Sequence, residues 1–535
     1  MIDKNINSIS KLRSLKPTLI DNITLLNKSN KNNNNNININ NNNLSTYSEP
    51  LPDESNKIAK KKQKQSFWIE GYGCSASFAD MEMIAGQLKN NGFEIANNPN
   101  QASISLIVTC SVKEKTEHRM IHRINRLSKN NKPLVIAGCL PSADQKLVEK
   151  INPNASLMGP SSINKTLEIV NSTLKGQKAV FLQNSEIEKI NFPKIRINPI
   201  ISIIEIASGC LSECSFCQTK LAKGVLQSYR IGKIINQINH DLKTGTREIW
   251  LTSTDNGCYG RDIGTNLVEL LKKCDELEEE KEENEDFKIR VGMMNPMYLK
   301  DMINGLIDIY LKSNKIFKFI HIPVQSGSEE VLRKMKRGHT AKIFNEIVSR
   351  FREKIPDMTI ATDIITGFPD ETEEDFELTL KMIKELEPDI INSSKFSPRP
   401  GTSAFKLKRT DQKIITQRSA RLHSVIKNIA KKRNSRWLNW EGNILIDEIN
   451  NGELKGRNQY YKSIIIKNFN EKIFTNTKQK EGYYKNNGFV NSSVGGGDLY
   501  SMNLNNHNNN LPLGKTMMVK ITGYSNHTLE GIQIT

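Results

Sequence analysis

Six short apolar runs in the middle of the chain alternate with amphipathic segments of helical spacing. Such repeats of strand and helix predict a parallel sheet that closes into a partial or full (β/α)6 barrel, with its chemistry at the carboxyl ends of the strands. We therefore expect an α/β fold whose central domain covers residues 198–436. The predicted strands are 201–206, 248–251, 288–293, 317–322, 358–365 and 390–396, and the helical segments between them include 231–242 and 267–277.

A second α/β pattern precedes the central domain, over residues 66–175. Cys74, Cys110 and Cys139 each lie just beyond one of its apolar runs. Because the carboxyl ends of parallel strands share the edge where ligands bind, this pattern favours a second three-cysteine site; three separately buried cysteines are the alternative. The predicted strands are 67–69, 104–108 and 134–137, and a helical pattern covers 81–88.

The two ends of the chain have different compositions. Residues 439–535 contain short apolar strands between turn residues, at 444–446, 463–466, 517–521 and 531–534, which predicts a small β-barrel. Residues 468–511 are rich in Asn, Gly and Lys, so we expect a flexible insertion within that barrel. Residues 1–65 are rich in Asn, Lys and Ser and cannot bury enough apolar surface to fold, which predicts a disordered tail.

Three cysteines follow the first strand of the predicted central barrel: Cys210, Cys214 and Cys217. Three thiolates hold three corners of a four-iron cluster and leave the fourth iron open for a substrate or cofactor. A structural zinc site needs four ligands, and the next candidates, His240 and Cys258, stand singly. A disulfide suits a small secreted chain and not one of 535 residues. The spacing therefore favours an iron–sulfur site.

The chain is basic, with 76 Lys and Arg against 58 Asp and Glu and a net charge of +18. Such an excess favours an anionic partner, above all nucleic acid. Part of the charge lies at 57–64, but a second basic segment, 418–436, lies deep in the chain. Eight cysteines at this length do not form a disulfide scaffold and indicate a reducing compartment. No apolar run is long enough to span a membrane, so the expected location is the cytoplasm.

Several short motifs surround these cysteines and the ends of the predicted strands, with Phe216 directly before the third cysteine of the central loop. That loop resembles the signature of the radical S-adenosylmethionine (SAM) enzymes. Together the motifs resemble the radical SAM methylthiotransferases, most of all the eukaryotic and archaeal branch that acts on N6-threonylcarbamoyladenosine in tRNA. Relatives often carry Asn where Ser77 and Val108 stand. The motifs lie at 71–77, 108–112, 137–141, 251–262, 292–296, 321–328, 362–369 and 397–402, and the loop 259–267 most favours this branch.

The resemblance implies a reaction with two [4Fe-4S] clusters and no catalytic residue beyond their six cysteine ligands. SAM would chelate the open iron of the cluster on Cys210, Cys214 and Cys217 and be cleaved to a 5′-deoxyadenosyl radical. That radical would abstract the hydrogen at C2 of the modified adenosine next to the anticodon. A second cluster, on Cys74, Cys110 and Cys139, would carry the sulfur, and a second SAM would supply the methyl group. The reductant and the sulfur source stay open.

Candidate SAM contacts lie at the ends of the predicted strands. Polar groups there could hold the ribose, amine or carboxylate of SAM, although a helix cap or a turn is the alternative for each. His321, at the end of another strand, is more often a core or rim residue than a catalyst. The polar candidates are Asp255, Asn295, Gln325 and Asp363, and Phe216 in the cysteine loop is a further candidate.

The last domain resembles the TRAM module, a small RNA-binding barrel, through residues 456–458, 513–515 and 528–531. Lys455, Arg457 and Lys515 would contact phosphates there without reading sequence. The basic segment 418–436 could extend the same surface or be an ordinary exposed helix.

Other functions stay open at this point. A methylthiotransferase could act on isopentenyladenosine in tRNA or on a ribosomal protein, and a non-catalytic RNA-binding protein with a structural metal is a more distant alternative. Some relatives end in a hydrophobic anchor to the endoplasmic reticulum, and this sequence stops at Thr535 without such a segment, so that location is not expected.

Overall fold

The structure is a computed structural model that describes residues 64–111, 114–277, 286–450, 453–467, 489–491, 499–502 and 512–534. The predicted tail at 1–65 lies almost wholly outside the described residues, and so does most of the predicted insertion at 468–511. Among the described residues, no helix combines the length and apolarity needed to cross a membrane.

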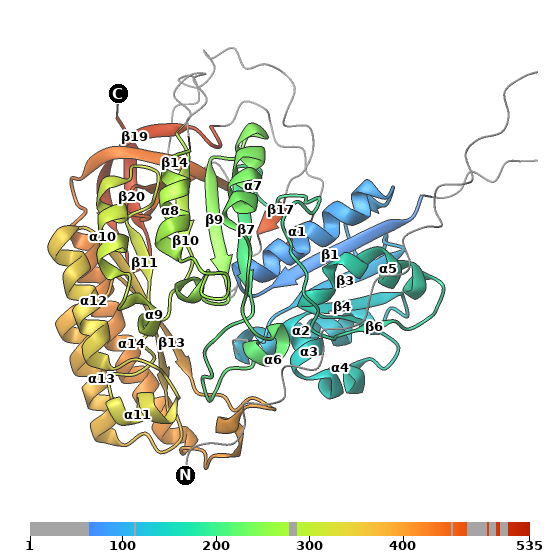
Figure 1. Ribbon diagram of the computed structural model, residues 1–535, viewed down its shortest axis with the longest axis horizontal. Coiled ribbons are helices and arrows are strands. Elements are labelled where there is room, and N and C mark those ends of the chain that lie inside the picture. Colours follow the sequence, from blue (N-terminus) through green and yellow to red (C-terminus); the bar gives the residue numbers. More distant parts are fainter. Residues whose placement is uncertain are drawn as a thin grey trace, which may run out of the picture. The chain divides into compact units, whose positions relative to one another are not determined.

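The first part of the fold is a parallel sheet with helices on both faces (Figure 1). Alternate residues of a strand face opposite sides, so Phe67 and Ile69 pack with the core under α1 while Trp68 packs with the core under α2. Both faces are buried, as is usual for parallel sheets. The strands are β1 (Ser66–Tyr72), β2 (Glu94–Ile95), β3 (Ile104–Thr109), β4 (Leu134–Gly138), β5 (Ser156–Met158) and β6 (Val180–Phe181), and the helices are α1 (Ser75–Asn90), α2 (Glu114–Ser128), α3 (Cys139–Ala143), α4 (Gln145–Ile151), η1 (Pro160–Lys165) and α5 (Thr166–Leu174).

Two strands from the predicted insertion extend this sheet. β18 (Leu499–Met502) pairs antiparallel with β1, and β17 (Phe489–Asn491) pairs with β18. The backbone of β18 pairs with N–H and C=O groups that β1 would otherwise leave unpaired at the edge of the sheet. The expectation of a wholly flexible insertion within the barrel is therefore wrong for these two strands, because they belong to the N-terminal sheet.

The central domain is the predicted partial barrel of six βα units (Figure 1). Its strands form a sheet in the order β10-β9-β7-β8 and a second sheet in the order β11-β12-β13, and β10 and β11 are adjacent. The strands are β7 (Ile201–Ser208), β8 (Gln227–Ser228), β9 (Glu248–Ser253), β10 (Lys288–Val291), β11 (Phe319–His321), β12 (Thr359–Thr366) and β13 (Ile390–Lys395). The helices and 3-10 turns are α6 (Thr219–Lys223), α7 (Ile231–Lys243), η2 (Asn256–Cys258), α8 (Leu267–Asp275), α9 (Pro296–Leu299), α10 (Ile303–Lys312), α11 (Glu329–Lys334), α12 (Ala341–Lys354), α13 (Glu373–Leu386), η3 (Ser403–Lys406) and α14 (Gln412–Ser435).

The C-terminal strands close into the predicted small barrel, in the order β14-β15-β16-β20-β19. Its core is built from alternate residues of each strand, such as Ile444 and Ile446 on one strand and Val519 and Ile521 on another. The sequence did not reveal β15, since Leu454 is its one large apolar residue. The strands are β14 (Glu441–Asn450), β15 (Glu453–Asn458), β16 (Ser463–Ile466), β19 (Thr516–Tyr524) and β20 (Leu529–Gln533).

An aromatic residue fastens the small barrel to the central domain. Tyr461, in the turn between β15 and β16, packs on Phe317 and Phe319 with ring centroids 4.9 and 4.8 Å apart. The neighbouring Gln459 accepts a backbone hydrogen bond from Lys318 (2.8 Å). Contacts of this kind fix the barrel at the amino-terminal end of β11.

Asp389, which precedes β13, is a buried ion-pair centre at the same joint. It pairs with Lys462 of the barrel (3.1 Å) and with Arg433 of α14 (3.1 Å). Burial alone would raise the pKa of Asp389, but the charges of Lys462 and Arg433 lower it. The carboxylate therefore stays charged and holds both elements in place.

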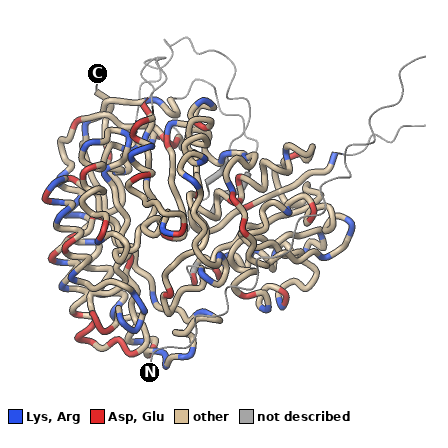
Figure 2. Tube along the Cα trace, viewed as in Figure 1, with Lys and Arg blue, Asp and Glu red and all other residues tan. Residues whose placement is uncertain are grey.

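Acidic groups of the same chain neutralise much of the basic segment 418–436. Arg418 is buried and pairs with Glu371 and Glu373, and Arg421 pairs with Glu373. Figure 2 shows acidic residues close to the basic ones along these outer helices. These ion pairs hold α14 against α13 and the turn before it, and Arg418, which is buried, is not available as a surface contact.

Candidate active site

One cavity of about 1270 Å³ lies between the central barrel and the N-terminal sheet. It extends from the carboxyl ends of β7, β9 and β10 to the start of β7 and to the small barrel. Its lining includes all six cysteines that the sequence indicated as cluster ligands. The five candidate SAM contacts also line it. Cysteines from two separate α/β patterns, up to 143 positions apart in the sequence, thus open onto one space.

The loop after β7 presents Cys210, Cys214 and Cys217 to this cavity. Gly209 has a φ of +72°, and a Cβ there would collide with the Val225 carbonyl oxygen, so only glycine fits the turn that leads into the loop. The Sγ of Cys214 accepts a hydrogen bond from the Arg337 guanidinium (3.3 Å), which also donates to the Pro323 carbonyl (2.8 Å). Sequence reasoning missed Arg337, which lies 123 residues from Cys214.

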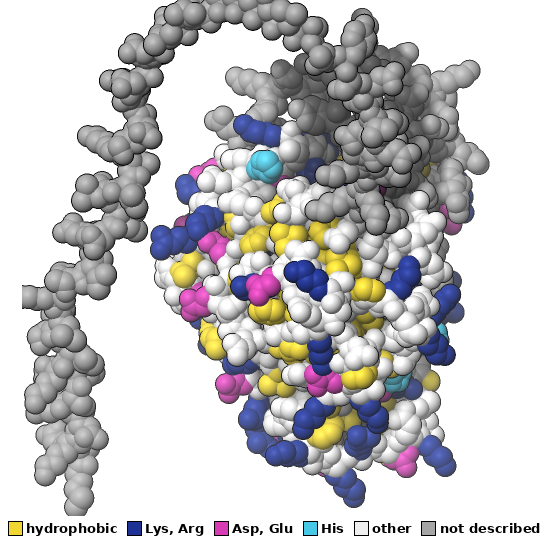
Figure 3. All heavy atoms as spheres, turned by 90° about the vertical axis from the view of Figure 1, so that its right-hand side faces the viewer, with side chains coloured by type: hydrophobic (Ala, Val, Ile, Leu, Met, Phe, Trp, Pro, Cys, Tyr) yellow, Lys and Arg dark blue, Asp and Glu magenta, His cyan; other side chains and the backbone are white. Residues whose placement is uncertain are grey.

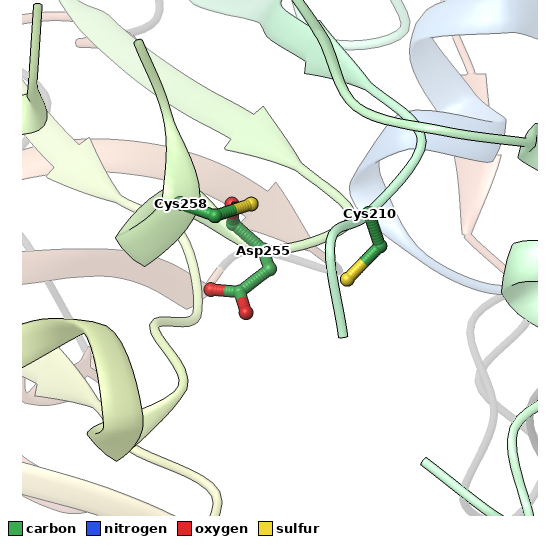
Figure 4. Close-up of side chains that lie close together, drawn as sticks. All are labelled: Cys210, Asp255 and Cys258. Atoms are coloured by element: carbon green, nitrogen blue, oxygen red, sulfur yellow. Dashed lines mark hydrogen bonds between the residues drawn. The ribbon is translucent and has the colours of Figure 1, made fainter. Parts of the chain in front are cut away.

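Cys258 lies beside Cys210, which the sequence did not suggest (Figure 4). One ligand atom each from Cys210, Asp255 and Cys258 lies within 4.8 Å of the others. A hydrogen bond with the Cys258 thiol lowers the pKa of Cys210 to about 7 and raises the pKa of Cys258. The sulfur of Cys258 also lies 3.1 Å from the Asp255 carbonyl oxygen. The arrangement makes Cys258 a neighbour of the three-cysteine loop and a candidate fourth ligand.

Replacing Cys258 with alanine distinguishes these two roles. We expect the variant to keep its iron after anaerobic reconstitution, because three thiolates already hold the cluster. The change should destabilise the fold by about 1 kcal/mol through the lost buried sulfur. Iron counting and thermal unfolding measure the two effects, and loss of half the iron would show that Cys258 is a ligand.

Asp255 and Asn295 are engaged as caps, the alternative that the sequence left open. The Asp255 carboxylate accepts hydrogen bonds from the backbone of Gly257 and of Asn295, each 3.0 Å long. Burial raises the pKa of Asp255 to about 6. The Asn295 side chain caps α9 by accepting from Met297, and it donates to Ser212 Oγ (3.3 Å). Both side chains help to fix the cavity wall. The remaining hydrogen-bonding capacity of the Asp255 carboxylate and the Asn295 amide is available to a ligand.

The other candidates line the same cavity. Gln325 is buried, has a φ of +78°, and leaves its Oε1 without a hydrogen-bond partner among the described residues. Asp363 is held by His321 Nε2 (3.1 Å) and Asn392 Nδ2 (2.9 Å). Phe216 packs against the apolar group of Val331, Met335 and Phe368. An unsatisfied buried oxygen beside a carboxylate suits a ligand with N–H or O–H donors.

The second trio is assembled from three neighbouring strands of the N-terminal sheet. Cys74 follows β1, Cys110 follows β3, and Cys139 begins α3 directly after β4. Gly73 has a φ of +116°, and a Cβ there would lie 2.7 Å from the Cys110 sulfur. Because glycine has no side chain, the backbone at Gly73 can lie this close to the Cys110 thiol.

Electrostatic effects differ among these thiols. A hydrogen bond from Cys110, supported by the charge of Lys223, holds the pKa of Cys74 well below its usual range. Burial raises the pKa of Cys139 to about 12, although the charge of Lys223 acts against this. Thiolates are the metal-binding form of cysteine, so a cation close to this trio favours metal binding.

The donor sets fit the clusters that the sequence predicted. Each trio offers three sulfurs that line the same cavity, and three thiolates match three of the four corners of a four-iron cluster. Cys214 already accepts a hydrogen bond from a cation, as cluster-binding thiolates commonly do.

A buried charge cluster beside the second trio was not predicted. Lys189 pairs with Asp80 (2.6 Å) and Glu205 (2.8 Å), and Lys223 pairs with the other oxygen of Glu205 (2.8 Å). The single signal in the sequence is Glu205, a charged residue inside the apolar strand 201–206. Its partners could not be found by spacing, since Lys189 and Asp80 are 109 residues apart.

The three basic residues expected on the small barrel lie in different settings. Lys455 pairs with Glu448 (2.7 Å), and Lys515 is half-buried in the turn before β19. Arg457 pairs with Asp447 (2.6 Å) and lies over the Tyr461 ring, 4.4 Å from its centroid. Arg457 faces the cavity at the joint between barrel and central domain, so its expected role as an open phosphate contact does not match its position.

Two family models match parts of the chain. An uncharacterized protein family, UPF0004, matches residues 66–159, and the radical SAM superfamily matches residues 204–383. A solved structure, the radical S-adenosylmethionine methyltransferase TsrM from Kitasatospora setae, gives a TM-score of 0.46 at 12% identity and covers 64% of this chain and 75% of that chain.

Curated relatives extend over most of the chain. A probable threonylcarbamoyladenosine tRNA methylthiotransferase of Pyrococcus horikoshii is 38% identical over 403 residues, which are 75% of this chain and 93% of the relative. The threonylcarbamoyladenosine tRNA methylthiotransferase of Homo sapiens is 38% identical over 368 residues, which are 68% of this chain and 62% of that protein. The chain therefore belongs to the threonylcarbamoyladenosine tRNA methylthiotransferase family, within the radical SAM superfamily.

Proposed function

We propose that this protein converts N6-threonylcarbamoyladenosine next to the anticodon of tRNA to its 2-methylthio derivative. The observation that carries the proposal is that two three-cysteine sites, from two different α/β domains, open onto one cavity. A single cluster would suffice to generate a radical, whereas inserting sulfur also needs a site that supplies sulfur at the same place. The names of the family members indicate the substrate.

The proposal includes two [4Fe-4S] clusters and SAM as cofactors. Cys210, Cys214 and Cys217 would hold the cluster that binds SAM, and the trio formed by Cys74, Cys110 and Cys139 would hold the other. When bound, these cofactors supply radical hydrogen abstraction and a sulfur donor, which no protein side chain can provide at an unactivated aromatic carbon.

The chain's own residues position the reactants. Asp255, Asn295, Gln325 and Asp363 all line the cavity, so a ligand bound there can meet polar groups from several strand ends. Phe216, within the cysteine loop, packs its apolar ring against the small cluster that contains Val331, Met335 and Phe368. These residues exclude water and orient SAM, and Arg337 neutralises negative charge at Cys214.

Charge and fold support tRNA as the macromolecular substrate. The net charge of +18 favours a polyanion. On the face shown in Figure 3, lysine and arginine side chains are spread over the surface with fewer acidic side chains among them. The closed five-stranded barrel matches the expectation of a TRAM-like module, with Lys455 and Lys515 as the remaining candidate phosphate contacts. We also propose the cytoplasm as the location, because all eight cysteines are free thiols.

The test is conversion of defined RNA by anaerobically reconstituted protein. Anticodon stem-loops carrying threonylcarbamoyladenosine, isopentenyladenosine or adenosine are incubated with SAM and a reductant, and the nucleosides are analysed by mass spectrometry. We expect the 2-methylthio product from the first stem-loop alone. Product from the isopentenyladenosine stem-loop would assign a different acceptor, and zinc in place of iron would refute the enzymatic function.

A further inference from the structure

Lys223 connects the two cysteine sites. It ends α6, a short helix that begins two residues after Cys217. This helix packs against α3, whose first residue is Cys139. The Lys223 side chain is 3% exposed and lines the cavity together with Cys74 and Cys139. The cation therefore lies at the second trio although it belongs to the loop that carries the first.

Buried ion pairs fix the position of the Lys223 ammonium. Glu205 binds Lys223 through one carboxylate oxygen and Lys189 through the other, and Lys189 is tied in turn to Asp80. Two lysines and two acids form this fully buried group, so moving Lys223 would leave one buried oxygen of Glu205 without its cation. An ammonium has three N–H donors, and Glu205 is the one acceptor recorded for Lys223 among the described residues.

The two lysines of α6 lie in different surroundings. Lys220, on the same helix, pairs with the exposed Glu213 and provides a comparison within α6. Of these two lysines on one short helix, only Lys223 lines the cavity that Cys74, Cys110 and Cys139 also line.

We propose that Lys223 is a positioning residue of the second cluster, whose ammonium donates hydrogen bonds to an anionic sulfur ligand on the open iron and raises the reduction potential of the cluster. Sulfide and thiolate ligands are anionic, and a charged hydrogen bond in a buried site is strong and directional. A fixed positive charge also favours the more negative, reduced state of a cluster. This inference rests on the proposed second cluster.

The test isolates that cluster in the full chain by replacing Cys210, Cys214 and Cys217 with alanine. Lys223→Met removes the charge, Lys223→Arg keeps it, and Lys220→Met is the matched control on the same helix. Titration with hydrosulfide, followed by the EPR signal of the reduced cluster, measures ligand affinity. EPR-monitored redox titration measures the midpoint potential.

We expect Lys223→Met to weaken hydrosulfide binding about tenfold, which corresponds to about 1.4 kcal/mol. If loss of the charge disfavours the reduced cluster tenfold relative to the oxidised cluster, the midpoint potential falls by about 59 mV for a one-electron couple. Lys223→Arg should recover most of both effects, and Lys220→Met should match the parent. A merely structural role for Lys223 would move neither the affinity nor the potential of clusters that have assembled.

The outcomes separate this inference from the proposed function. If the parent variant binds no iron, the second cluster is refuted, and the inference falls with it. If the cluster is present and Lys223→Met matches its parent in both titrations, the inference alone is overturned. Should Lys223→Met not assemble, the double change Lys223→Met and Glu205→Gln removes both partners of the ion pair, and the same two titrations decide.

Discussion

Replacement of Cys214 with alanine is expected to abolish reductive cleavage of SAM. The variant would leave two thiolates for a cluster that needs three from the protein, and it would leave the Arg337 guanidinium without its sulfur acceptor. Formation of 5′-deoxyadenosine should fall to the level of protein stripped of iron, and the iron content should fall by about half, from about eight to about four atoms per chain. Chromatography of the reaction and iron counting measure both.

The matched control is Cys274→Ala. Cys274 is also a free cysteine, but it is buried on α8 in the hydrophobic core of the central domain and lies outside the cavity. Its replacement should cost about 1 kcal/mol of stability and leave iron content and SAM cleavage intact. If Cys214→Ala retained its iron and still formed 5′-deoxyadenosine, the assignment of the radical-generating site would be wrong.

Replacement of Cys74 with alanine is expected to separate the two halves of the reaction. The Cys210 loop stays intact in this variant, so SAM cleavage should remain measurable. The 2-methylthio product should fall below detection, because the second trio loses the thiol that Cys110 hydrogen-bonds and Lys223 stabilises as a thiolate. Quantifying 5′-deoxyadenosine and modified nucleoside in one reaction measures the separation.

This separation depends on independent clusters. The two trios come from different domains and share no ligand, and each lines its own part of the cavity wall. Loss of both products would instead show that the second trio supports the first site. Continued formation of the 2-methylthio nucleoside would remove Cys74 from the sulfur-supplying role.

Much of the fold could be predicted because periodicity reports local structure. The apolar runs at 201–206 and 358–365 became β7 and β12 almost residue for residue, since strands buried on both faces are continuously apolar. β15 was missed because its Gly and charged residues carry no apolar signal, and its position is set by pairing with β14 and β16. The β18 strand was missed because its partner, β1, is more than 400 residues away.

The residues of the site likewise divide into those that could be predicted from the sequence and those that could not. The cysteines could be predicted, because each follows a strand and the ends of parallel strands share an edge. Arg337 and Lys223 could not, since they reach Cys214 and the second trio only through the tertiary fold. Arg457 was expected to contact phosphates because of its basic charge within the segment that resembles the TRAM module, whereas Asp447 and Tyr461 hold it at a domain joint. Charge composition therefore indicated a partner class without locating the residues that bind it.

The central claim is that this chain adds the methylthio group to threonylcarbamoyladenosine in tRNA. The most direct test is mass spectrometry of tRNA nucleosides from cells that lack the protein, complemented with the wild type or with Cys74→Ala. We predict that the 2-methylthio derivative disappears, that unmodified threonylcarbamoyladenosine accumulates in its place, and that only the wild type restores the product. An unchanged level of 2-methylthio-threonylcarbamoyladenosine in the cells lacking the protein would contradict this account.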